Sequence, residues 1–93
     1  MPIILYGIGS MMIADVAETC TRLGLQIAAL VKNVEGKTYE LPGQTVIRAE
    51  NVSTELTALE FAVPLFTPFH RRQAAEDARQ RGFTRSRRSR SDR

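Results

Sequence analysis

Two glycines and a serine near the N-terminus have the residue types and the spacing of a phosphate-binding turn. The segment GIGS, residues 7–10, follows an apolar run and precedes an amphipathic segment. Gly7 would permit a tight turn out of a strand. Gly9 would let the backbone approach a phosphate at the N-terminus of the next helix, where N–H groups and the helix dipole favour an anion. Gly7, Gly9, Ser10 and the adjacent Met11 are therefore candidate ligand-binding residues.

The turn departs from the dinucleotide-binding fingerprint at two positions. Met12 stands where that fingerprint has its third glycine, and would hold the helix further from the strand. The second apolar run ends in Lys32 and Asn33, where a nicotinamide dinucleotide site has an acidic residue for the ribose hydroxyls. Ordinary NAD binding is therefore not expected. Lys32 could instead meet a phosphate and Asn33 a ribose or a base edge, or both could be solvated loop residues.

Cys20 and His70 are the remaining residues suited to reactive chemistry. The chain has one cysteine and one histidine, too few for an internal disulfide or a metal cluster. His70 has no nucleophile or acid partner beside it in the sequence, so we interpret it as a helix-surface residue. Cys20 falls on the apolar side of a predicted helix, where a core role is expected. We expect no catalytic residue, no metal and no cofactor, and no enzyme activity of this chain by itself is indicated.

The first apolar run and the segment after it must position the glycine turn. The run is continuous rather than alternating, which is typical of a strand buried on both faces. In the following segment, apolar residues recur at helical spacing along one face: Met12, Val16, Cys20 and Leu23. Ser10 is available as the N-cap of this helix.

The rest of the chain continues as alternating strands and helices. Thr67 and Pro68 predict a second helix start, with threonine as N-cap and proline at the first helical position. Pro64 cannot donate to a ladder, so it predicts an edge strand or the end of a strand. The predicted strands are residues 2–7, 25–33, 45–47 and 60–66, and the predicted helices are residues 10–24 and 67–82; residues 34–44 form a loop and 48–59 are weakly helical.

This order of elements predicts one small α/β domain over residues 1–83. Short connections on either side of a helix favour a parallel βαβ unit with a right-handed crossover. We expect a Rossmann-like three-layer domain with about four parallel strands flanked by helices. Ligands of such sheets bind beyond the carboxyl ends of the strands. Four loops would lie there, at residues 7–11, 32–37, 48–51 and 66–71.

Charge is concentrated in the last ten residues. The whole chain has a formal net charge of +3, but residues 84–93 carry five arginines and one aspartate, whereas residues 1–83 carry eight basic and nine acidic residues. We expect residues 84–93 to be a disordered Arg/Ser-rich tail that contacts nucleic acid only weakly and non-specifically. No basic leader with an apolar core and no long apolar run is present, so a cytoplasmic rather than a secreted or membrane protein is expected.

Residues 3–83 resemble a known family in the order of their motifs. The segments ILYGIGSMMIADVAETCTRLGLQIAALVKN, LPGQTVI and FAVPLFTPFHRRQAAEDARQRGF follow the pattern of the N-terminal domain of bacterial sugar acyltransferases of the sialic acid O-acetyltransferase type. In that family this domain binds a nucleotide-linked amino sugar, and a left-handed β-helix behind it carries the catalytic histidine. This chain has no hexapeptide repeats after Gly82, so the resemblance implies a binding domain without the catalytic half.

The resemblance also assigns positions to the ligand. Gly7, Gly9 and Ser10 would form the phosphate or sugar loop, Lys32 and Asn33 would take the place of nucleotide contacts, and Arg71 or Arg72 that of the late-helix arginine. The chain departs from the family at Ser10 and Met11, where a further glycine and a histidine are usual, and at Lys32 and Asn33, where acidic residues are usual.

Two classes of function follow from these observations. The first is a nucleotide or nucleotide-sugar binding domain, with a UDP-amino sugar as the implied ligand. The second is a small homo-oligomeric interaction protein whose basic tail makes electrostatic contacts. A short sheet with exposed edges favours a homodimer in either class. The abrupt change of composition after residue 83 also leaves open a truncated or frame-shifted acyltransferase.

Overall fold

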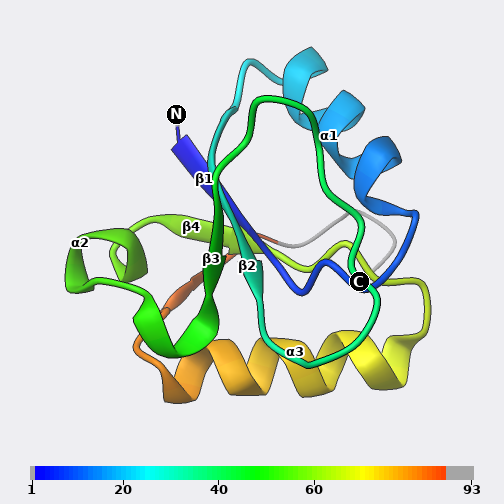
Figure 1. The fold of residues 1–93 in the computed structure, drawn as a ribbon. Helices are drawn as coiled ribbons and strands as arrows, with labels where there is room; N and C mark the ends of the chain where they lie inside the picture. The colour runs from blue at the N-terminus through cyan, green and yellow to red at the C-terminus, as the bar shows by residue number, and fades with distance from the viewer. Residues whose placement is uncertain (1, 88–93) are drawn as a thin grey trace.

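A five-stranded parallel sheet lies between two layers of helices and loops. The computed structural model describes residues 2–87, and its strand order is β3-β2-β1-β4-β5 (Figure 1). The small Rossmann-like α/β domain predicted from the sequence is therefore confirmed, with five strands where about four were expected. The strands are β1 (Pro2–Tyr6), β2 (Gln26–Lys32), β3 (Val46–Arg48), β4 (Glu60–Ala62) and β5 (Arg85–Ser86), and the helices are α1 (Ile13–Arg22), the short 3₁₀ helix Ala49–Asn51, α2 (Thr54–Thr57) and α3 (Pro68–Gln80).

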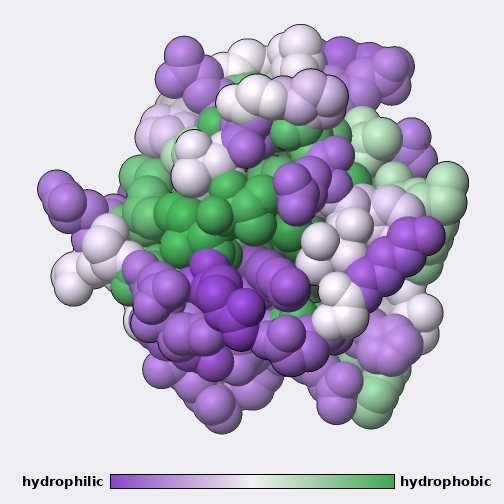
Figure 2. All heavy atoms as spheres, in the orientation of Figure 1, coloured by the Kyte–Doolittle hydropathy of each residue, from purple (hydrophilic) through white to green (hydrophobic). Residues whose placement is uncertain are grey.

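The central strand β1 is buried on both of its faces. Ile3 and Leu5 pack with α1, whereas Ile4 and Tyr6 pack with α3. Figure 1 shows α1 and α3 on opposite sides of the sheet, and Figure 2 shows a hydrophobic band between hydrophilic side chains above and below it. Because both faces of β1 are covered, the strand needs the continuous apolar run seen in the sequence.

Three aromatic rings fill the core between the sheet and α3. Tyr6, Phe61 and Phe83 are fully buried, and their ring centroids are 5.5–6.3 Å apart in edge-to-face arrangements. Phe83 reaches this cluster because Gly82, with φ +111°, turns the chain back after α3. The cluster ties β1, β4 and the end of α3 together.

The start of α1 differs from the prediction. The helix begins at Ile13 rather than directly after Ser10, and Met12 is its N-cap residue. The Ser10 hydroxyl accepts a hydrogen bond of 3.2 Å from the backbone N–H of Met12, so it stabilises a turn that precedes the helix. Val16 and Cys20 of the predicted apolar face pack in the core together with Ile13, whereas Leu23, the C-cap residue beyond the helix, is 57% exposed.

The fourth strand and the second long helix follow the prediction more closely. Pro64 lies two residues beyond β4, which is an internal strand, so the interpretation as a strand end is confirmed. Thr67 is the N-cap residue of α3 and Pro68 its first residue, although the Thr67 side chain makes no capping hydrogen bond. The weakly helical region contains the 3₁₀ helix and α2, and α2 is capped by the Ser53 hydroxyl.

A fifth strand extends the sheet beyond residue 83. Arg85 pairs with Glu60, and Ser86 pairs with Phe61, in parallel register. The first residues of the segment predicted to be a disordered tail therefore belong to the sheet. These residues are polar and exposed, so hydrophobicity could not indicate a strand here. Residues 88–93, the rest of that predicted tail, lie outside the described residues.

Candidate ligand-binding cleft

A cleft of about 490 Å³ opens at the carboxyl ends of β1, β2 and β4. The chain passes from β1 to β2 and β3 on one side, and returns to β4 and β5 on the other. The crevice between β1 and β4 is therefore the point where the strand order reverses, the usual place for a ligand in an open α/β sheet. The lining residues are Gly7, Gly9, Ser10, Asn33, Val34, Leu65, Phe66, Thr67, His70, Gln73, Ala74 and Asp77.

Four of the seven residues predicted from the sequence line this cleft. Gly7, Gly9, Ser10 and Asn33 come from the loops after β1 and β2, and they converge although more than twenty residues separate the two loops. The structure brings together three of the four predicted loops, because segment 66–71 joins them from the other side. The predicted loop 48–51 contributes no residue to the cleft lining.

The other three predicted residues lie outside the cleft lining. Met11 is 69% exposed on the turn before α1. Lys32 is the last residue of β2, where it pairs in register with Arg48 of β3. Arg71 lines a different groove, because one residue along a helix rotates the side chain by about 100° from His70.

The glycine turn has one strained position and one open position. Gly7 has φ +92° and is buried, and its N–H donates to the Val31 carbonyl at 2.9 Å. A Cβ at Gly7 would lie 3.6 Å from the Asn33 Oδ1, an ordinary contact, so the backbone conformation rather than space requires glycine there. Gly9 is exposed, and the atom nearest to an added Cβ would be the Lys37 carbonyl oxygen, at 4.0 Å.

Backbone N–H groups are available beside the cleft. Within residues 2–87, the N–H groups of Gly9, Ser10 and Met11 have no backbone acceptor. These groups precede α1, where the helix dipole adds positive potential. Among the residues that the structure describes, no lysine or arginine lines the cleft, so the backbone N–H groups are the donors offered to an anion bound here.

Sequence reasoning missed most of the wall that α3 supplies. His70, Gln73 and Asp77 line the cleft together with Ala74, and their spacing places them on one face of the helix. His70 is exposed, as expected of a helix-surface residue, and its ring packs edge-to-face on Phe69 with centroids 5.6 Å apart. The spacing of His70, Gln73 and Asp77 was the available signal for this wall.

Exposed hydrophobic side chains lie in the cleft lining and at residues adjacent to it in the sequence. Phe66, 69% exposed, and Val34, 56% exposed, belong to its lining. Met11 and Phe69 are also more than half exposed, on the neighbouring turn and on the first turn of α3. Large hydrophobic side chains gathered in this way on a small protein mark a surface for a ligand or a partner.

Asp77 connects the cleft to the aromatic core. The Tyr6 hydroxyl donates to the Asp77 Oδ2, and the Arg81 Nε donates to the same oxygen at 3.3 Å. Burial of the phenol raises the pKa of Tyr6 above its ordinary value of 10.0, and the hydrogen bond and negative charge of Asp77 raise it further. Tyr6 therefore stays protonated and holds the Asp77 carboxylate in the α3 wall of the cleft.

Replacing Tyr6 with phenylalanine is expected to lower the free energy of unfolding by about 1–2 kcal/mol at neutral pH, because Asp77 loses a charge-assisted hydrogen bond. The raised pKa stabilises the fold below the ordinary tyrosine value of 10.0, and this stabilisation declines as pH rises through the folded-state value. Urea unfolding followed by circular dichroism would measure both effects. Tyr39→Phe is the matched control, and an alkaline decline as steep in Tyr6→Phe as in the unmodified protein would contradict this assignment.

Comparison with protein-family models, curated proteins and solved structures finds no match to this chain. Within residues 2–87, no group of three or more histidine, cysteine, aspartate or glutamate side chains is placed to hold a metal ion. In the same range, no helix combines the length and the hydrophobicity needed to cross a membrane.

Proposed function

We propose that the cleft binds a nucleotide or a nucleotide-sugar, and that the chain is a binding domain without catalytic activity of its own. The observation that supports this most is the convergence of the loop after β1 with Asn33 at the point where the strand order reverses. The resemblance to the front half of sugar acyltransferases suggests a UDP-amino sugar as the ligand. The cleft supplies polar, backbone and apolar groups suited to the three parts of such a molecule.

The phosphates, the ribose and the base of the ligand would each meet a suitable group of the cleft. The N–H groups of Gly9 and Ser10 would donate to phosphate oxygens at the start of α1. The side-chain amides of Asn33 and Gln73 would bond the ribose or a base edge, since each offers a carbonyl acceptor and two N–H donors. Phe66, exposed at the mouth, would cover the face of the base.

A second candidate function rests on the exposed side chains around the cleft mouth. Met11, Val34, Phe66 and Phe69 would be covered if this edge of the sheet contacted a second copy of the chain. In this alternative the chain is a small homo-oligomeric interaction protein. Sedimentation analysis distinguishes the two, because Phe66→Ser would then convert a dimer to a monomer, whereas the ligand proposal predicts no change in mass.

Isothermal titration of the full chain with UDP-N-acetylglucosamine tests the proposed function. Asn33→Ala is expected to weaken binding about fivefold, the effect of losing a hydrogen bond between neutral groups. Lys32→Ala is the matched control, since Lys32 adjoins Asn33 but lies outside the cleft lining, and its Kd should stay within about twofold of the unmodified protein. No binding by the unmodified protein, or a larger loss in Lys32→Ala, would overturn the proposal.

A further inference from the structure

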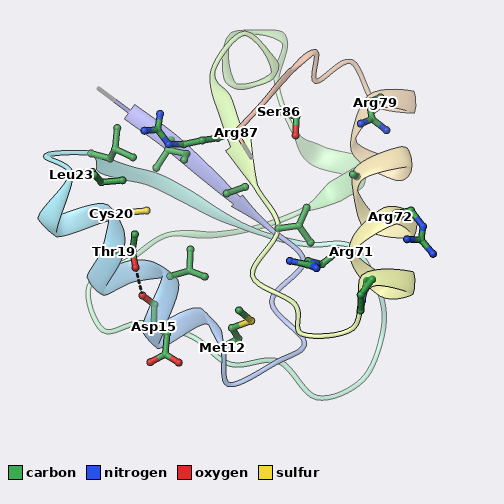
Figure 3. A pocket seen from close by; sticks show the side chains of 17 residues that line it. Met12, Asp15, Thr19, Cys20, Leu23, Arg71, Arg72, Arg79, Ser86 and Arg87 are labelled. Carbon is green, nitrogen blue, oxygen red and sulfur yellow. Dashed lines mark hydrogen bonds between the residues drawn. The ribbon is translucent and has the colours of Figure 1, made fainter. Parts of the chain in front are cut away.

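A second, larger groove lies on the α1 side of the sheet. Its volume is about 650 Å³, and it runs over β4 and β5 between α1 and the side of α3 (Figure 3). Its apolar surface is aliphatic, with Val16, Leu25, Ala62 and Val63 among the lining residues and Leu23 57% exposed at one end. No aromatic side chain of the described residues lines it.

This groove is a gap in the helical cover of a parallel sheet. The α1 side of β1 and β2 is covered by α1, and the α3 side of β1 and β4 by α3. Over β4 and β5 on the α1 side, no helix of residues 2–87 is packed, and Ala62 remains only half-buried. Parallel sheets occur almost only with both faces covered. The groove therefore lies where a further helix would complete the cover of the sheet.

Arginine side chains surround the apolar surface. Arg71, Arg72, Arg79 and Arg87 line the groove, and Asp15 is the one carboxylate among the described lining residues. In Figure 3, Arg71 extends from α3 into the space between the two helices, and Arg87 lies toward the Cys20 and Leu23 end of α1.

Arg79 and Arg87 form intramolecular ion pairs and remain accessible. Arg79 contacts the Glu76 carboxylate at 3.4 Å, and Arg87 contacts Glu60 at 3.2 Å. Their side chains are still 50% and 38% exposed. Because a guanidinium has five N–H donors, a single ion pair leaves donors for a further carboxylate.

We propose that this groove is the docking site for an acidic amphipathic helix of a partner protein. The apolar stripe of such a helix would lie on the aliphatic surface, and its aspartate and glutamate side chains would meet the arginines. The chain's own residues 88–93 carry three arginines and one aspartate. Their net positive charge does not complement a groove lined by arginines. An aliphatic surface without aromatic rings also lacks the stacking groups that single-stranded nucleic acid uses.

Three matched peptides of about 18 residues test this proposal against the full chain. The first has leucines at helical spacing and glutamates elsewhere, the second replaces the glutamates with lysines, and the third replaces the leucines with glutamines. Fluorescence anisotropy should show micromolar binding of the first peptide and at least about tenfold weaker binding of the other two.

Charge reversal locates the binding surface. The double substitution Arg72→Glu and Arg79→Glu should weaken binding of the acidic peptide by about tenfold, because like charges would face it. Arg22→Glu is the control, since Arg22 is an exposed arginine of α1 outside the groove lining, and it should change the Kd less than about twofold.

Several results would overturn the proposal. The first is that the lysine peptide binds as tightly as the acidic peptide, and the second is that the acidic peptide does not bind. The third is that a uridine oligonucleotide binds more tightly than the acidic peptide and loses its binding in the double variant. The fourth is that the chain self-associates and that the double substitution abolishes the self-association. The last two would assign the groove to nucleic acid or to a second copy of the chain. None of these results bears on the nucleotide cleft, whose lining shares no residue with the groove.

Discussion

Replacement of Phe61 by alanine is expected to lower the free energy of unfolding by about 4 kcal/mol, the usual cost of removing a buried phenyl ring. Phe61 is fully buried on β4, and its ring contacts both Tyr6 and Phe83 at 5.5–6.3 Å between centroids. Such a loss is a large share of the total stability of a small domain, which is about 5–15 kcal/mol. Urea unfolding by circular dichroism would measure it, and we expect part of the protein to be unfolded without urea.

Phe69→Ala is the matched control for this prediction. Phe69 has the same side chain and lies in the first turn of α3, but it is 55% exposed. Its replacement should change the free energy of unfolding by less than about 0.5 kcal/mol, as surface substitutions usually do. Equal losses for the two variants would mean that the aromatic cluster is not the centre of the core.

Gly7→Ala is expected to lower the free energy of unfolding by about 1–2 kcal/mol, a large effect for the addition of a single methyl group. Gly7 has φ +92°, a backbone conformation that an alanine adopts only with strain. The space around it is adequate, since the nearest side-chain atoms to an added Cβ are at 3.6 Å. The shift in thermal unfolding temperature would measure this cost. A Gly7→Ala variant as stable as the unmodified protein would contradict the left-handed turn.

Gly9→Ala separates the structural and the binding roles of the turn. The φ of Gly9 is not in the left-handed region, and an added Cβ would have no atom closer than 4.0 Å. Stability should therefore change by less than about 0.5 kcal/mol, whereas affinity for UDP-N-acetylglucosamine should fall about fivefold because the methyl group hinders approach to the backbone N–H groups. Loss of stability without loss of affinity would contradict a phosphate-binding role for this turn.

The fold was predictable where the sequence carries a strong local signal. The continuous apolar run of β1 and the Thr67, Pro68 start of α3 gave elements close to those observed. The predicted start of α1 was wrong because the Ser10 hydroxyl accepts a hydrogen bond from the Met12 N–H in a turn before the helix. Residue type alone does not decide between this turn and a helix N-cap. The strand β5 was missed because its pairing follows from the anchoring of Phe83 in the core rather than from its own side chains.

The candidate cleft was predictable only on the side that the strands determine. The loops after β1 and β2 meet because neighbouring parallel strands end at the same edge of the sheet, which places Gly7 and Asn33 together. The wall from α3 depends on how far the helix is rotated about its own axis when it packs. That rotation directs His70 and Asp77 to the cleft and Arg71 to the groove, and it is set by the burial of Ala74 and Ala78 against the core.

An amide-resolved NMR titration of the full chain with UDP, UDP-N-acetylglucosamine, CMP and NAD is the most direct test of nucleotide binding in the cleft. We predict that a uridine ligand shifts the backbone signals of Gly9, Ser10 and Asn33 in a saturable manner, while Leu23 and Arg72 in the groove stay unchanged. No shift with any of the four ligands, or shifts confined to the groove, would contradict the account and leave the GIGS segment as a structural turn.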